Sequence, residues 1–166
     1  MDTRNIVLIG MMGCGKTTVG GLLAARLGRE LADTDALIEA REGRTIPAIF
    51  QSDGEAYFRD REREAAVAQA RRTGLVIACG GGLPLHAAAM EPLRAGGVVL
   101  FLARDPGAIY DSGMLGDRPL AQEGRAAFLE RFARREPVYR ACAHHIITEF
   151  TSPETTADAI MEVLER

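Results

Sequence analysis

The chain has 166 residues, of which 47% are hydrophobic and 26% are charged, close to the usage of ordinary soluble domains. This length is enough for one domain with a substantial core and too short for two, and the composition excludes disordered and fibrous classes. The formal net charge of −3 gives no indication of binding to nucleic acid or to an anionic membrane. Any anionic ligand must therefore be held by local clusters of basic residues.

Cysteine usage and the N-terminal sequence both indicate the cytoplasm. Cys14, Cys79 and Cys142 are odd in number and widely spaced, which argues against a disulfide framework and against a zinc site. The apolar stretch after Arg4 stops at Gly10 and is too short for a signal peptide or a membrane span. We therefore expect a cytoplasmic protein with neither a membrane partner nor a nucleic-acid partner.

Apolar runs along the chain predict the strands of a parallel sheet. Residues 6–9 form an unbroken run of β-branched residues and leucine, which is typical of a strand buried on both faces. Similar runs occur at 75–78, 98–102 and 145–148, and a shorter strand is expected around residues 31–32. Together they predict a central parallel sheet of five strands.

Helical stretches alternate with these strands. The longer helices are expected at 16–27, 55–72, 85–95 and 153–166. A smaller helical region reaches residue 50 and is interrupted by Gly43 and Pro47. This alternation predicts a doubly wound, three-layer α/β/α fold in a single domain that spans residues 1–166.

The segment from Gly10 to Thr17 fits the phosphate-binding P-loop at every required position and lies between an expected strand and an expected helix. Its glycines let backbone N–H groups approach phosphate oxygens, and the helix N-terminus adds about half an elementary positive charge. Lys16, the only lysine in the chain, is expected to bridge the β- and γ-phosphates of ATP, and Thr17 to bind Mg²⁺. The context on both sides argues against a chance match. The expected ATP-binding residues here are Gly13, Cys14, Gly15, Lys16, Thr17 and Thr18.

Asp33 and Asp35 lie at the carboxyl end of the short strand around residues 31–32, where α/β folds build their sites. In an extended chain, a spacing of two directs both side chains to one face, so the pair could serve a metal ion and an acceptor hydroxyl. Alternatively, Asp33, Thr34 or Asp35 caps the helix that begins near Ala36. The pattern by itself favours neither interpretation.

Three consecutive glycines, Gly80 to Gly82, follow the predicted strand at 75–78. Such a run loses much backbone entropy on folding and contributes no side-chain packing, so another group is expected to approach its backbone closely. A tight turn between strand and helix explains the run equally well.

Several arginines are candidates for binding anions. Arg59 lies in the charged stretch 57–64, where most charges are expected on a solvated helix face with internal ion pairs. Arg118 lies in a loop flanked by glycines, where it could close over a transferring phosphoryl group or simply be solvated. Arg140 follows Tyr139 and could face the carboxyl edge of the sheet.

Taken in order, these motifs resemble the shikimate kinase family along nearly the whole chain. Their joint order and spacing is far more specific than the phosphate loop, which many unrelated kinases share. The residues that carry the resemblance are Gly10 to Thr17, Asp33 to Asp35, Gly54 and Glu55, Phe58 to Glu62, Gly80 to Gly82, Arg118 to Leu120, and Pro137 to Arg140.

The resemblance implies a P-loop kinase that transfers the γ-phosphoryl group of ATP to the 3-hydroxyl of shikimate, a step toward chorismate and the aromatic amino acids. It implies that Asp35 deprotonates this hydroxyl and that Asp33 holds Mg²⁺ through water beside Thr17. Lys16 and Arg118 would complete the catalytic set, because both would neutralise charge on the transferring group.

The resemblance also implies how the acceptor is held. Arg59 and Arg140 would bind the shikimate carboxylate, and Gly80 to Gly82 would supply backbone contacts to the ring. The substrate-binding region would be a small helical insertion at about 33–61, and a mobile lid at about 112–124 would carry the arginine finger.

The adenine side departs from the family. Members usually carry an arginine on the helix before the lid, and here residues 108–112 contain none; a second arginine, common just before the late proline, is also missing. We expect Pro153 to form one side of the adenine slot and Tyr110 or nearby backbone to form the other. This arrangement predicts loose selectivity for the base.

Two other functions are compatible with parts of the pattern. Another small-metabolite P-loop kinase, of the gluconate or nucleoside monophosphate type, would share the phosphate loop and lid, and the Asp-Thr-Asp and triple-glycine motifs argue against it. A catalytically inactive binding domain is the second alternative. We expect an active monomer whose partners are the small molecules ATP and shikimate.

Overall fold

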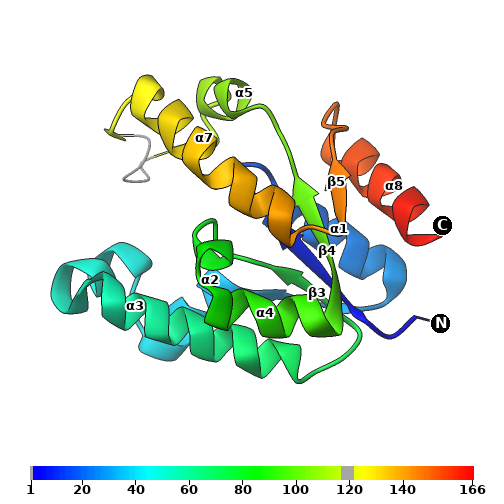
Figure 1. Ribbon diagram of the computed structural model, residues 1–166, viewed down its shortest axis with the longest axis horizontal. Coiled ribbons are helices and arrows are strands. Elements are labelled where there is room, and N and C mark those ends of the chain that lie inside the picture. The colour runs from blue at the N-terminus through cyan, green and yellow to red at the C-terminus, as the bar shows by residue number, and fades with distance from the viewer. Residues whose placement is uncertain (1, 117–121) are drawn as a thin grey trace.

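The computed structural model describes residues 2–116 and 122–166, and its centre is one sheet of five parallel strands (Figure 1). The strand order is β2-β3-β1-β4-β5, so the first strand of the chain lies in the middle of the sheet. The predicted parallel sheet of five strands is confirmed. Its strands are Asn5–Ile9 (β1), Glu30–Asp33 (β2), Leu75–Ala78 (β3), Gly97–Leu102 (β4) and His145–Ile147 (β5).

Helices cover both faces of this sheet and make the three predicted layers. The described helices are Lys16–Leu27 (α1), Thr34–Glu42 (α2), Ile46–Ala70 (α3), Ala87–Gly96 (α4), Pro106–Asp111 (α5), Arg125–Cys142 (α7) and Pro153–Leu164 (α8). On one face α1 and α8 pack together, and Arg26 and Asp158 form an ion pair of 2.6 Å between them. On the other face lie α3, α4 and α7 (Figure 1). Right-handed crossovers place α1 on one face and α3, α4 and α7 on the other. The reason is that the chain moves along the sheet in one direction from β1 to β2 and in the opposite direction in each later connection between strands.

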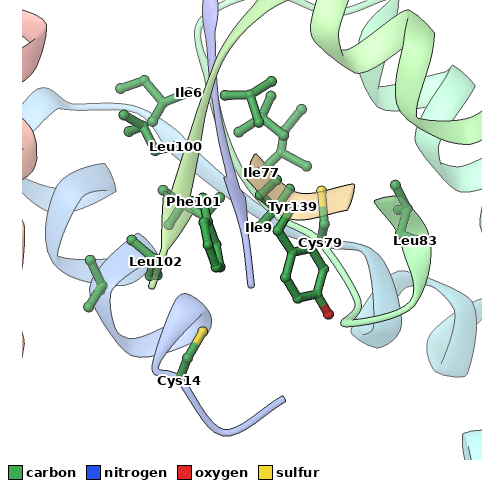
Figure 2. Packing of buried hydrophobic residues seen from close by; sticks show 14 of the residues in the cluster. Ile6, Ile9, Cys14, Ile77, Cys79, Leu83, Leu100, Phe101, Leu102 and Tyr139 are labelled. Carbon is green, nitrogen blue, oxygen red and sulfur yellow. The ribbon is translucent and has the colours of Figure 1, made fainter. Parts of the chain in front are cut away.

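The main hydrophobic core lies on both faces of the central strands. Every residue of β1, β3 and β4 is buried, since each of these strands is sandwiched between two helical layers. Figure 2 shows Phe101 at the carboxyl end of β4 and the ring of Tyr139, from α7, among these core side chains; the two ring centroids are 5.2 Å apart. The carboxyl edge of the sheet is therefore anchored to α7.

The helix at Ile46–Ala70 begins earlier than the sequence predicts. Pro47 does not interrupt it, because Pro47 lies in the first turn, where its missing N–H has no helical partner to lose. The interruption comes at Gly54, whose φ of 86° and ψ of 175° kink the helix. The end of the smaller helical region and the helix predicted at 55–72 are thus parts of one kinked helix. Its first half extends beyond the edge of the sheet (Figure 1).

A second apolar cluster lies between α2 and α3. Ile38, Ile49 and Phe58 are buried there, separate from the main core. The rings of Phe50 and Phe58 lie 4.8 Å apart across the kink at Gly54. This satellite cluster fixes the kinked helix against α2, and with it the direction of the side chains that follow Phe58.

Candidate active site

The phosphate loop connects the carboxyl end of β1 to the N-terminus of α1. Gly13 and Gly15 have φ values of 79° and 100°, a left-handed conformation that other residues adopt only with strain. At Gly13 a Cβ atom would also lie 2.9 Å from Ile109 and 3.0 Å from Leu115, so the loop rests directly on α5 and the segment after it. The predicted strand, loop and helix therefore occur in the required order.

Lys16 folds back onto its own loop. Its Nζ donates hydrogen bonds to the carbonyl oxygens of Gly10, at 2.7 Å, and Met11, at 3.0 Å. The residue is only 9% exposed. The ammonium group is therefore held at the centre of the loop, where it can turn to a phosphate group by exchanging two hydrogen bonds.

Cys14 lies beneath the phosphate loop. It is 2% exposed, and its Sγ lies 3.7 Å from Nζ of Lys16. In Figure 2 its sulfur points toward the carboxyl ends of β1 and β4, among the core side chains. Only its backbone can therefore face a phosphate, whereas Thr17 and Thr18 at the start of α1 are both exposed.

Asp33, the last residue of β2, serves two groups at once. Its Oδ2 accepts a hydrogen bond of 2.6 Å from the Thr17 hydroxyl, and its Oδ1 accepts one of 3.0 Å from the backbone N–H of Ala36. The sequence left two interpretations of Asp33 open, capping of α2 and a role beside the phosphate loop. In the structure Asp33 caps α2 and also contacts Thr17 at the start of α1.

A hydroxyl oxygen and a carboxylate oxygen side by side suit Mg²⁺, which is commonly bound through one or two protein oxygens together with substrate phosphates. Because Thr17 donates its proton to Asp33, a lone pair of its oxygen remains available for a metal ion. Among the described residues, no group of three or more histidine, cysteine, aspartate or glutamate side chains could hold a metal. The site therefore fits a cation that arrives with a phosphate ligand.

Asp35 lies in the first turn of α2. The prediction that Asp33 and Asp35 share one face of an extended chain is wrong, because the helix begins at Thr34, between them. Thr34 is completely buried, and its hydroxyl accepts a hydrogen bond of 2.9 Å from the Gly80 backbone N–H. That bond ties the end of β2 to the end of β3 and brings Asp35 against the glycines.

Two of the three consecutive glycines, Gly80 and Gly82, leave space for other side chains. None of them has a positive φ, so backbone conformation alone would permit other residues. At Gly80 a Cβ atom would lie 2.5 Å from Oδ1 of Asp35, and at Gly82 one would lie 2.7 Å from Nη2 of Arg59. The sequence left two interpretations of this run open, a tight turn and the close approach of other groups. The structure supports close approach.

The middle glycine joins this region to the phosphate loop. A Cβ atom at Gly81 would lie 3.3 Å from the backbone nitrogen of Met12 and 3.6 Å from Nη1 of Arg135. We call the glycines Gly80 to Gly82 with Asp35, Arg59, Glu62 and Arg135 the triple-glycine cluster. It lies directly beside the loop that is built to hold phosphates.

Arg59 is oriented by a buried carboxylate. Its Nη1 donates a hydrogen bond of 2.8 Å to Oε1 of Glu62, and the side chain of Glu62 is only 1% exposed. Burial raises the pKa of Glu62 to about 7, against the opposing effect of Arg59. The pair thus holds a guanidinium group at Gly82 next to an acid that titrates close to neutral pH.

Arg135 is a site residue that the sequence interpretation missed. Its guanidinium lies close to Gly81 and to Tyr139, whose hydroxyl donates a hydrogen bond of 2.6 Å to the Gly81 carbonyl oxygen. Arg135 and Tyr139 are four residues apart, so they share one face of α7. Since a large aromatic residue such as Tyr139 commonly packs inward, this spacing was the signal that could have identified Arg135.

Arg140 does not lie in the triple-glycine cluster. It forms an ion pair of 2.8 Å with Glu136 on the same helix, and its guanidinium lies 5.9 Å from the centre of the Phe101 ring. It lines a different pocket, together with Arg104 and Asp105 just before α5. The expectation that Arg140 holds an acceptor carboxylate is therefore corrected, because one residue beyond Tyr139 the helix faces another direction.

On the adenine side, Tyr110 is partly buried and its ring centroid lies 5.7 Å from that of Phe128. Asp111 forms an ion pair of 3.1 Å with Arg125, so an arginine from α7 neutralises this carboxylate. Pro153 is exposed in the first turn of α8. Arg118, the expected arginine finger, lies outside the described residues.

The amino-acid sequence is similar to a known family of kinases. A family model described as "Shikimate kinase" matches residues 12–165. The chain is 43% identical over 169 aligned residues to the shikimate kinase of Symbiobacterium thermophilum, which covers 98% of this chain and 95% of the relative. It is 44% identical over 146 residues to the shikimate kinase of Nitrosomonas europaea, which covers 86% of this chain and 69% of the relative.

Solved structures agree with this similarity. Shikimate kinase from Acinetobacter baumannii in complex with shikimate superimposes with a TM-score of 0.90 at 37% identity, covering 98% of this chain and 93% of that chain. Shikimate kinase from Bacteroides thetaiotaomicron gives a TM-score of 0.89 at 30% identity, with 99% of both chains covered. A sugar kinase from Janibacter sp. HTCC2649, at 21% identity and a TM-score of 0.66, shares the fold alone.

Proposed function

The chain belongs to the shikimate kinase family, and from this premise we propose that it transfers the γ-phosphoryl group of ATP to the 3-hydroxyl of shikimate. The observation that carries the proposal is the triple-glycine cluster beside the phosphate loop. Gly81 lies against the loop at Met12, while Gly80 and Gly82 lie against a carboxylate and a guanidinium group. A base and an anion-binding group thus border the place where a transferable phosphate would lie.

On the donor side, the N–H groups of Gly13, Cys14 and Gly15 and the N-terminus of α1 bind the phosphates of ATP. Lys16 turns from the carbonyl oxygens of Gly10 and Met11 to the β- and γ-phosphates. The backbone of Thr17 and the hydroxyl of Thr18, both at the helix start, complete this grip on the phosphates.

Thr17 would hold a bound Mg²⁺ directly, and Asp33 would do so through water, since the Asp33 carboxylate already accepts hydrogen bonds from Thr17 and from the start of α2. The ion would supply positive charge to the β- and γ-phosphate oxygens. The support for this assignment is the pairing of a hydroxyl donor with a carboxylate at 2.6 Å.

On the acceptor side, Asp35 orients the 3-hydroxyl and takes its proton as the oxygen attacks the γ-phosphorus. The bond between that phosphorus and the bridging oxygen breaks, and ADP leaves. A positioned general base of this kind contributes roughly a factor of 10² to 10⁴ in rate. Gly80 supports the assignment, because any side chain there would collide with the Asp35 carboxylate.

The shikimate carboxylate binds to Arg59 and Arg135, with Arg135 in place of the Arg140 expected from sequence. Two guanidinium groups on either side of the glycines form a fork for one carboxylate, and each charge-assisted hydrogen bond contributes about 1.5 to 3 kcal/mol. The glycine backbone supplies contacts to the ring.

The lid at about 112–124, with Arg118 as the arginine finger, remains part of the proposal, as does the substrate-binding region at about 33–61. For the adenine slot we retain Pro153 on one side. The other side is assigned to backbone near Tyr110, since the ring of Tyr110 packs on Phe128.

We also propose that the protein acts as a monomer in the cytoplasm, on small molecules only. Within residues 2–116 and 122–166, no helix has the length and apolar character that a membrane crossing needs. The net charge of −3 supports the absence of a nucleic-acid partner. Size-exclusion chromatography with light scattering tests the oligomeric state.

The proposed function is tested by measuring ADP release with shikimate, gluconate and AMP as acceptors. We expect turnover of shikimate far above that of the other two, dependent on Mg²⁺. Faster turnover of gluconate or AMP would contradict the assignment of the acceptor. Binding of nucleotide without any turnover would show instead a binding domain.

A further inference from the structure

Next to the triple-glycine cluster lies an open pocket of about 360 Å³ that is lined by Leu85, Arg131, Arg134 and Arg135. Arg134 and Arg135 follow Arg131 by three and four residues on α7, so both lie beside Arg131 on the helix surface. Leu85 ends the short 3₁₀ helix that follows Gly82, and it is 41% exposed. Arg135 therefore belongs both to the triple-glycine cluster and to the lining of this pocket, which we call the outer pocket.

The described residues that line the pocket carry only positive charge. None of Leu85, Arg131, Arg134 and Arg135 is acidic. Arg131 forms an ion pair of 2.6 Å with Glu123, but its buried Nε has no hydrogen-bond partner among the described residues. Arg134 is exposed and forms no hydrogen bond or ion pair with any described residue. Like charges held together in this way are unfavourable for folding, so packing does not explain them.

The binding of one carboxylate within the triple-glycine cluster needs only Arg59 and Arg135. Arg131 and Arg134 are not used by the proposed mechanism, and both lie on the side of Arg135 that faces the outer pocket. In a chain with a net charge of −3, a local group of arginines is a focus of positive potential. Such a focus raises the local concentration of small anions.

We propose that this outer pocket is a capture site for the carboxylate of the acceptor acid. Arg131 and Arg134 attract and briefly hold the carboxylate, and Arg135, which borders both places, passes it inward to Arg59. The inference rests on the proposed function, since it takes the acceptor to be an organic acid. It adds two residues, neither of which touches the reacting atoms, that govern how readily the acid is bound.

The test is Arg134→Gln, because Arg134 is exposed and its replacement breaks no described contact. We expect the affinity for shikimate, measured by calorimetry, and kcat/KM for shikimate to fall about three- to tenfold at about 10 mM salt. At about 300 mM salt the variant and the wild type converge within about twofold, because screening removes the attraction. The KM for ATP stays unchanged.

Two variants serve as controls. Arg134→Lys keeps the charge and is expected to stay within about twofold of the wild type. Arg71→Gln removes another exposed arginine, at the C-terminal end of α3. Arg71 lies near the start of β3 and thus at the opposite edge of the sheet, so this change should leave the affinity and kcat/KM for shikimate unchanged. An Arg134→Gln variant with unchanged affinity and salt dependence, or with a raised KM for ATP instead, overturns the capture site.

Failure of the capture site differs from failure of the proposed function. Wild-type protein that binds shikimate without phosphorylating it would remove the kinase assignment, and calorimetry of Arg134→Gln would still decide the capture site. Wild-type protein that neither binds nor phosphorylates shikimate would overturn both.

Discussion

The phosphate loop and the triple-glycine cluster lie side by side at the carboxyl edge of the sheet, but they are assembled in opposite ways. The loop is a single segment from Gly10 to Thr17, and its lysine is held by carbonyl oxygens of the same segment. The cluster combines side chains from α2, α3 and α7 around the end of β3. The functional groups of the first come from one continuous segment, whereas those of the second come from three separate helices.

This difference determines how each region tolerates change. In the loop, the requirements are local backbone conformations and one ammonium group. In the cluster, Gly80 and Gly82 leave room for the side chains of Asp35 and Arg59, which come from distant parts of the chain, and Gly81 lies against the backbone of Met12. We expect substitutions in the cluster to affect the acceptor while leaving ATP binding intact, which the following predictions test.

The largest effect is expected for Asp35→Asn. An amide retains the size of the side chain but cannot accept the acceptor proton, so turnover of shikimate should fall by a factor of about 10² to 10⁴. Nucleotide affinity, measured by calorimetry, should change little. If the variant phosphorylates shikimate as fast as the wild type, Asp35 is not the general base.

The second prediction compares two arginines on one helix. Arg135→Ala should raise KM for shikimate by about one to two orders of magnitude, because a charge-assisted hydrogen bond to the carboxylate is lost. Arg140→Ala, which removes a surface ion pair with Glu136, should stay within about threefold. The reverse order of effects would restore Arg140 as the carboxylate ligand.

A third prediction concerns Gly82→Ala. The new methyl group would lie 2.7 Å from Nη2 of Arg59, and because this is the end of a flexible side chain, the guanidinium can move aside. We expect a rise of about tenfold in KM for shikimate with little loss of stability.

The matched control for that glycine is Gly21→Ala in α1, where an added Cβ meets no atom within 4 Å. This change should raise the free energy of unfolding by up to about 1 kcal/mol through helix propensity alone. It should leave the kinetics unchanged. Equal KM values for the two variants would show that Gly82 is not reserved for Arg59.

The last prediction, Glu62→Gln, concerns stability rather than acceptor binding, and its effect depends on pH. Burial raises the pKa of Glu62 to about 7 from 4.5, so the folded protein keeps a proton that the unfolded chain has already released. Stability from this group is complete below pH 4.5 and is lost as the pH rises through about 7.

Glutamine is neutral throughout, so relative to wild type the variant should gain about 2 kcal/mol in free energy of unfolding between about pH 5 and pH 8. Urea denaturation at both pH values measures this gain. A difference between the two proteins that does not vary with pH would mean that Glu62 does not titrate in this range.

The sequence predicts most of the fold and the whole phosphate loop, because both depend on local patterns. The buried strand at 75–78 and the helix Lys16–Leu27, capped by Gly28, are found where apolar runs and capping glycines predict them. Apolar runs and capping glycines could not single out Arg135, since several arginines occur nearby. Only its spacing of four residues from Tyr139, which places both on one face of α7, distinguishes it from the others. Likewise, the need for Gly80 to Gly82 becomes visible only when distant side chains are brought against them.

The contacts of Lys16 with the carbonyl oxygens of Gly10 and Met11 also bear on the stability of the protein. The same ammonium group that is expected to bind ATP crosslinks the backbone of its own loop. Its replacement by methionine would leave two inward-facing carbonyl oxygens without a donor. A kinase-dead variant made in this way would therefore also melt earlier, and its lost activity should be interpreted together with its thermal stability.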